Sequence, residues 1–182
     1  GGTFRCTGGY VLLGGGGTME TGATLDSDGA GYLYFNGGTH ALTGGTLTGS
    51  NYTYAGAGVV AVDGNVGAAT GPATGGFAIS GGTVTGSAVL SADHGYFSSG
   101  QISGSVTIRL TGDTTKEANQ QISMNGGTIR NEGTLTNRSS GNFDLDNNSA
   151  EGAGTLENRG TWTMEAGATY SNSYGGGQVV NY

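Results

Sequence analysis

The segment GGTIRNEGTLT (residues 126–136) returns as AGTLENRGTWT (residues 153–163). The two copies keep Gly, Thr, Asn and an apolar position, but they exchange Arg130 and Glu132 for Glu157 and Arg159. If equivalent segments stack on one another, like charges at equivalent positions repel and opposite charges attract. The exchange therefore predicts that equivalent residues of the two copies are direct neighbours in space.

A related phrase recurs along the whole chain: an apolar residue preceded by a small residue and then Thr or Gln, or Asn in the case of Val66. Its apolar positions are Met19, Leu47, Val66, Val84, Ile102, Ile129, Leu156 and Val179. They mark about eight units, in the period range of solenoids and other repeat proteins. Each unit carries alternating runs of three to six residues separated by Gly. Strands this short cannot bury a face alone, but they can pair with the equivalent strand one turn away around a narrow core.

This pattern predicts an all-β fold, a right-handed parallel β-helix of about eight irregular turns of 18–28 residues. The handedness follows from the strong right-handed preference of parallel crossovers. Residues 1–182 are interpreted as a single solenoid segment and, because strand-like sequence continues to the last residues, as a fragment of a longer repetitive chain. The polar segment 111–121 contains the only Lys and is predicted to be a loop that protrudes from the coil.

Stacking at the interstrand distance of about 4.8 Å predicts ladders of equivalent side chains. The inward aliphatic ladder is Ile129, Leu156 and Val179, and the inward Asn ladder, whose amides satisfy one another, is Asn131, Asn158 and Asn181. The expected ion pairs between turns are Arg130 with Glu157 and Glu132 with Arg159. Exposed pairs are worth about 1 kcal/mol or less, so we expect them to set the register more than the stability.

Composition excludes several classes of protein. Gly supplies 41 of the 182 residues, but one Pro and the lack of a Gly-x-y period exclude collagen. Nine Tyr, five Phe and many Thr and Val argue against disorder. The net charge of −7 and the scattered basic residues argue against a nucleic-acid partner, and no apolar run is long enough to span a bilayer. Cys6 is the only Cys and is expected to be a small buried apolar residue.

The phrases GGTLTGS, GGTVTGS, GGTIRNEGTLTNR and GTLENRGTWTM resemble those of bacterial β-solenoid surface proteins, meaning autotransporter passengers and filamentous-haemagglutinin-type adhesins. The unit length varies more here than in the most regular members of that group. The resemblance implies an exported, extended β-helix, located extracellularly or at the cell surface, that works as a stalk or adhesin. An open end of a parallel coil exposes unpaired backbone groups that are prone to pair with another chain. The expected partners are therefore flanking solenoid turns or further copies, joined end to end.

Candidate binding residues fall into two groups. Asp26 and Asp28 in LDSDGAG resemble the start of a calcium loop, but residue 37, where the loop requires Glu, is Gly, which favours a plain Asp/Gly turn and no metal or cofactor. The Tyr pairs, which could contact surface glycans or instead cover a thin core, are Tyr32 with Tyr34 and Tyr52 with Tyr54.

Two further patterns concern the surface. Thr-x-Thr pairs one unit apart, at 134–136 and 161–163, resemble in outline an ice-binding array, but the other pairs are irregularly spaced, which favours outward Thr of high β propensity. The Asn-x-Ser/Thr sequences, which are glycosylation acceptors in some hosts, begin at Asn51, Asn137 and Asn147.

Catalytic constellations are absent from the sequence. Parallel β-helices also host polysaccharide lyases and hydrolases, which need paired carboxylates or a base beside a metal. His40 and His94 lie far apart in the repeat, and Asp93 next to His94 points to the opposite face of an extended strand. We therefore expect a non-enzymatic structural or adhesive segment of an exported fibre. The alternative is a carbohydrate-binding or carbohydrate-cleaving β-helix module, similar to a viral tailspike.

Overall fold

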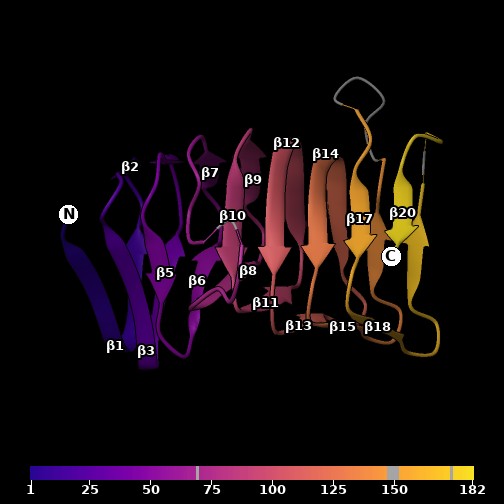
Figure 1. The fold of residues 1–182 in the computed structure, drawn as a ribbon, viewed down its shortest axis with the longest axis horizontal. Coiled ribbons are helices and arrows are strands. Elements are labelled where there is room, and N and C mark those ends of the chain that lie inside the picture. Colours follow the sequence, from indigo (N-terminus) through magenta and orange to yellow (C-terminus); the bar gives the residue numbers. More distant parts are fainter. Residues whose placement is uncertain (69, 147–151, 173) are drawn as a thin grey trace.

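The computed structural model of the chain describes residues 1–68, 70–146, 152–172 and 174–182. These residues form an all-β structure without a helix, in which parallel strands stack as a β-solenoid of about eight turns. Figure 1 shows the turns following one another along the long axis, with the two termini at opposite ends. The prediction of a parallel β-helix is confirmed.

The described strands belong to two sheets. The first sheet has nine strands: β1 (Thr3–Leu13), β3 (Thr24–Phe35), β5 (Thr46–Thr48), β6 (Tyr52–Ala55), β8 (Gly76–Ile79), β11 (His94–Phe97), β13 (Asp113–Lys116), β15 (Thr134–Asn137) and β18 (Thr161–Met164). The second has eleven: β2 (Gly17–Met19), β4 (Thr39–Leu42), β7 (Val59–Val62), β9 (Thr83–Gly86), β10 (Val89–Ala92), β12 (Gly100–Leu110), β14 (Gln121–Asn131), β16 (Asn142–Asp144), β17 (Thr155–Asn158), β19 (Thr169–Ser171) and β20 (Gln178–Asn181).

The second sheet bends into two faces. The first part of β14 pairs with β16, whereas its second part pairs with β17. The pairing of β12 with β14 shifts register after Gly104, which lies opposite Gly126. Both glycines have a positive φ, 72° and 94°, a conformation that side chains rarely adopt. Glycine at these two stacked positions therefore lets successive turns bend at the same corner.

Alternation along the short strands fills the core. In β6 and β7 every second residue is buried, as expected for strands with one face inward. The buried apolar side chains form one continuous cluster from Cys6 to Leu156. Because apolar burial is the main favourable contribution to folding, this continuous core holds the turns together. Cys6 belongs to it, as expected.

The turns differ in length although their strands stay in register. Phe77 lies opposite Gly95, whereas Leu135 lies opposite Trp162, so the second of these turns is clearly the longer one. The strands themselves differ little in length, with three or four residues each from β8 to β11 and from β15 to β18.

One part of the expected register is wrong. Ile129 lies opposite Ile108 of the preceding turn, whereas Ile102 lies on another face, opposite Val84 and Met124. The Gly-Thr-apolar phrase therefore occurs on two faces of the coil. Its recurrence alone does not give the length of a turn.

The expected protruding loop at 111–121 is also wrong. Residues 113–116 form β13, which pairs with β11 and β15 inside the first sheet. Thr114 and Lys116 point into the core and are 2% and 0% exposed. The segment enters the coil because Thr suits a half-buried strand and because backbone carbonyls surround the Lys116 ammonium, as described below.

Candidate functional site

Two columns of side chains run along the outer surface of the first sheet. The columns contain Tyr10, Tyr32, Tyr52, Gly76 and His94, and Leu12, Tyr34, Tyr54, Ala78 and Tyr96. The four Tyr residues singled out from the sequence therefore come together on neighbouring strands. Tyr10 and Tyr96 extend the same surface.

The Tyr rings pack mainly on one another. Tyr34 and Tyr54 are stacked with centroids 4.4 Å apart and planes 9° apart. Tyr32 meets Tyr54 edge to face at 5.9 Å, and Tyr52 meets Tyr54 at 5.7 Å. Such geometries contribute about 0.5–1.5 kcal/mol per pair beyond area burial. A ring face that is covered by another ring is not available to a sugar, so this packing favours a stabilising role.

The aromatic surface continues across a turn that contributes no ring. That turn places Gly76 and Ala78 in the two columns, and the His94 imidazole lies over the backbone of Gly76. From there it contacts the Tyr52 ring at 4.9 Å, and Tyr96 reaches Tyr52 at 6.0 Å. The two small residues thus let aromatic rings from turns on either side meet.

The hydroxyls of Tyr34, Tyr52, Tyr54 and Tyr96 stay neutral at ordinary pH. Burial raises the pKa values of Tyr34, Tyr52 and Tyr54, because desolvation disfavours the phenolate. Burial, together with the hydrogen bond it donates to Glu117 at 2.8 Å, also raises the pKa of Tyr96. The same hydrogen bond is the largest cause of the lowered pKa of Glu117. The phenols therefore act as hydrogen-bonding groups and not as bases.

A mixed-charge cluster lies over β12, β14 and β17. Arg130 Nε donates to Glu157 Oε2 at 2.6 Å across neighbouring turns. The expected pair of Glu132 with Arg159 does not form. Glu132 instead accepts hydrogen bonds from Arg109 Nε and Nη2 at 2.9 and 2.6 Å, and Arg159 Nη2 lies 3.5 Å from Glu157 Oε2.

Arg109 explains the exchange of partners. It lies opposite Arg130 in the preceding turn, so the two cations must turn to different carboxylates. Arg109 also donates to the carbonyl oxygens of Ala68 and Gly71. Its hydrogen bond is the largest cause of the lowered pKa of Glu132. Sequence reasoning missed Arg109, although the motif Thr-Ile-Arg at 107–109 and 128–130 was a usable signal.

The two ladders lie in the positions expected from the repeat. Ile129, Leu156 and Val179 occupy equivalent positions of successive turns, as do Asn131, Asn158 and Asn181. Asn131 Nδ2 donates to Asn158 Oδ1, and Asn158 Nδ2 to Asn181 Oδ1, both at 2.7 Å. The Asn158 amide therefore bridges two turns. Val179 and Asn181 in the last described turn are exposed, so the two expected inward ladders are interior only at their first two positions.

Asp26 and Asp28 hold an arginine. Arg5 from the neighbouring turn contacts them at 2.8 and 3.1 Å. Thr48 and Ser50 donate to the same carboxylates, and the Ser50 hydrogen bond is the largest cause of the lowered pKa of Asp28. An arginine occupies the position in which a cation would be bound.

Lys116 is the other buried cation. Its ammonium donates to the carbonyl oxygens of Ser98, Glu117 and Gln120 at 3.3, 3.1 and 2.7 Å. Burial lowers the pKa of Lys116 to about 8. The three carbonyls face a fully buried ammonium, so they bind the protein's own cation and hold the turn at 117–120.

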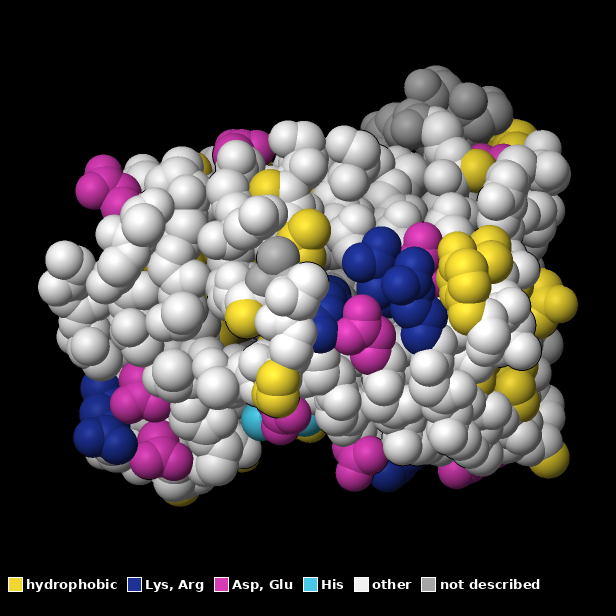
Figure 2. Space-filling model, in the orientation of Figure 1, with side chains coloured by type: hydrophobic (Ala, Val, Ile, Leu, Met, Phe, Trp, Pro, Cys, Tyr) yellow, Lys and Arg dark blue, Asp and Glu magenta, His cyan; other side chains and the backbone are white. Residues whose placement is uncertain are grey.

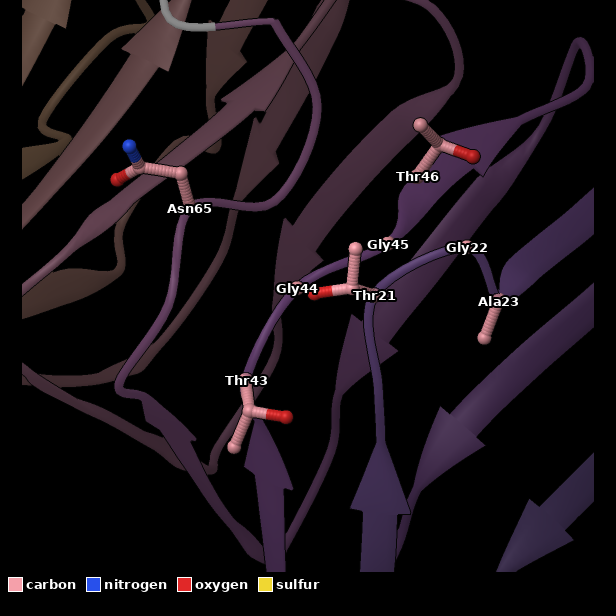
Figure 3. A pocket seen from close by; sticks show the side chains of 8 residues that line it. All are labelled: Thr21, Gly22, Ala23, Thr43, Gly44, Gly45, Thr46 and Asn65. Carbon is pink, nitrogen blue, oxygen red and sulfur yellow. The ribbon is translucent and has the colours of Figure 1, made fainter. Parts of the chain in front are cut away.

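An open hollow of about 460 Å³ lies at the corner before β3 and β5 (Figure 3). Its polar side chains are Thr21, Thr43, Thr46 and Asn65, and glycines form much of the rest. Asn65 Oδ1 already accepts a hydrogen bond from the backbone of Val89. Carboxylates and aromatic rings do not line this hollow, so it offers neither acid–base chemistry nor a stacking platform.

Within the described ranges, no group of three or more His, Cys, Asp or Glu side chains could hold a metal ion. The same residues include no helix long and apolar enough to cross a membrane. Of the acceptor sequences, Asn137 is fully buried, and Asn147 and Ser149 lie outside the described residues. Comparison of the chain with protein-family models, curated proteins and solved structures yields no match.

Proposed function

We propose that this chain is a non-enzymatic structural and adhesive segment of an exported fibre, located extracellularly or at the cell surface. The observation that carries the proposal is the continuous parallel pairing of the first sheet, in which eight successive strands follow one another from β1 to β18. At about 4.8 Å per turn, the segment contributes roughly 40 Å of rod. Flanking turns, or further copies, extend it end to end.

The carboxylates support a role without catalysis. A glycosidase needs one carboxyl group to remain protonated as a general acid. Here Glu132 and Glu157 are paired with arginines, and Glu117 accepts a hydrogen bond from Tyr96. The partners of Glu117 and Glu132 lower the pKa values of these two carboxyl groups, which favours their charged form. They suit carboxylates that fix neighbouring turns.

The second candidate is a carbohydrate-binding or carbohydrate-cleaving β-helix, favoured by the six Tyr rings gathered on one surface. The mutual packing of the rings weakens it. A Tyr54→Ala variant distinguishes the two roles: we expect lower thermal stability and unchanged glycan binding. Loss of glycan binding at unchanged stability would favour the second candidate.

Electron microscopy of the native material, with averaging along the rods, tests the proposal. We expect filaments with a continuous repeat of about 4.8 Å along the axis. Compact isolated particles without this repeat would contradict the fibre role. Hydrolysis or elimination products in a polysaccharide digestion assay would contradict the non-enzymatic role.

A further inference from the structure

Half of the basic side chains of this acidic protein lie in one cluster. The chain has six Lys and Arg residues and a net charge of −7. Arg109, Arg130 and Arg159 lie together with Glu132 and Glu157, and Figure 2 shows basic side chains gathered beside acidic ones on this surface. Three cations therefore face two anions in this cluster.

The hydrogen bonds divide these charges unevenly. Arg109 is almost completely buried and uses its Nε, Nη1 and Nη2 atoms for Glu132 and two backbone carbonyls. Arg130 and Arg159 share a single carboxylate oxygen, Glu157 Oε2, at 2.6 and 3.5 Å. Since a guanidinium has five N–H donors, most of the donors of these two arginines have no acceptor among the described residues.

The other surface arginines have a different balance. Arg5 faces two carboxylates, Asp26 and Asp28, and Arg138 faces one, Glu117. Among the described residues, only Arg130 and Arg159 form ion pairs with the same carboxylate oxygen, and the charge of Glu132 acts on both of them as well. Their side chains remain 27% and 43% exposed, so an external anion can reach them.

The aromatic neighbour of this pair suits a sugar ring. The Tyr182 ring is 72% exposed and its centroid lies 4.6 Å from Arg159 Cζ. Stacking on a guanidinium uses its flat face and leaves its N–H edge available for a planar anion. An aromatic ring beside an available N–H edge matches the apolar face and the acidic group of an acidic sugar.

We propose that Arg130, Arg159 and Tyr182 form a binding site for an acidic saccharide, in which the arginines hold a carboxylate or sulfate group. Guanidinium groups bind such anions with two parallel hydrogen bonds. The anion would also relieve the repulsion between two cations that share Glu157. This inference rests on the proposed adhesive role and assigns it a ligand and a surface.

The site can be tested by titrating the protein and following the arginine Nε–H signals in NMR spectra. The four ligands are a galacturonate tetrasaccharide, a sulfated disaccharide, a neutral maltotetraose and free sulfate. We expect one of the two acidic saccharides to shift the Arg130 and Arg159 signals, with affinity falling as salt is added. Arg130→Gln and Arg159→Gln should each weaken binding about tenfold. Arg5→Gln, which alters a similar ion pair between turns, should not.

Several outcomes would overturn the proposal. If the double variant Arg130→Gln, Arg159→Gln still binds the saccharide, the site lies elsewhere. If Arg5→Gln weakens binding equally, the binding is nonspecific. If free sulfate binds as tightly as the saccharides, the arginines form a simple anion site. If neither acidic saccharide binds at low salt, the proposed site does not exist. Rod formation, followed separately by electron microscopy, distinguishes these failures from failure of the proposed function.

Discussion

The imidazole of His94 lies over the backbone of Gly76, in the space that a Cβ atom would occupy. This relationship joins the aromatic rings of turns that the small residues Gly76 and Ala78 would otherwise separate. It also shows that a glycine in this protein can matter for the space it leaves above the sheet.

Replacement of Gly76 by Ala should displace His94 and destabilise the protein. The new Cβ would meet His94 Nε2 and, at 2.9 Å, the carbonyl oxygen of Asn51. Overpacking of this kind costs about 1–3 kcal/mol. Urea denaturation measures the loss, and Gly17→Ala, whose Cβ meets nothing within 4 Å, is the matched control. Equal stability of the two variants would contradict this account of the His94 position.

Replacement of Asn158 by Ala should interrupt the Asn ladder. Asn131 would lose an acceptor and Asn181 would lose a donor. Leaving buried polar groups unsatisfied costs about 1–3 kcal/mol, measured as the free energy of unfolding. Asn36→Ala, at an exposed position with no side-chain hydrogen bond to a described residue, should change it little. If Asn158→Ala lowers the free energy of unfolding no more than Asn36→Ala does, the Asn ladder does not stabilise the fold.

Lys116 should make stability depend on pH in the alkaline range. Its pKa is about 8 in the folded protein and about 10.4 when unfolded. Between these values the unfolded chain binds more protons at this site, so the free energy of unfolding rises with pH, by at most about 3 kcal/mol. The raised pKa values of the Tyr residues act in the opposite direction above about pH 10. Urea denaturation from pH 7 to 10.5 tests this.

The variant Lys116→Met isolates the Lys contribution. The rise between pH 8 and 10 should disappear, whereas the fall above pH 10 should remain. A wild-type curve that is flat or falling from pH 8 to 10 would mean that the carbonyls of Ser98, Glu117 and Gln120 compensate the burial of the charge.

Replacement of Arg109 by Met should be the most destabilising of the arginine substitutions. Glu132 and the carbonyls of Ala68 and Gly71 would lose their partner. Breaking a buried pair in this way costs about 3–5 kcal/mol. Thermal and urea unfolding of Arg109→Met should be compared with Arg5→Gln, an exposed pair worth about 1 kcal/mol or less. Similar losses in both variants would argue against a special role for Arg109.

The fold was predictable where the sequence nearly repeats itself. Residues 126–136 and their copy at 153–163 gave the register of Ile129 with Leu156 and of Arg130 with Glu157. The register failed one turn earlier, because β12 presents Ile102 and Ile108 on two faces and each follows a single polar residue, Gln101 or Thr107. Distinguishing them requires knowledge of where the chain bends, which the phrase alone does not contain.

The sites were less predictable because their partners come from outside the repeat. The pairing of Glu132 depends on Arg109 of the preceding turn, which lies outside the two copied segments. Lys116 was expected in a solvated loop, because its composition does not reveal the three carbonyls that surround its ammonium. Alternation along a strand predicts that the two rings of each Tyr pair share one face, but the stacking of Tyr34 on Tyr54 depends on which strands become neighbours.

The parallel pairing of neighbouring turns also has a mechanical consequence. The backbone hydrogen bonds between turns run along the long axis of the rod in Figure 1. A force that pulls the two ends apart therefore loads one turn at a time and should peel the coil open in sequence. The turn from Phe77 to Gly95 would release about 60 Å of extended chain, and the turn from Leu135 to Trp162 would release about 90 Å. Under tension, the irregular turn lengths become a series of unequal steps.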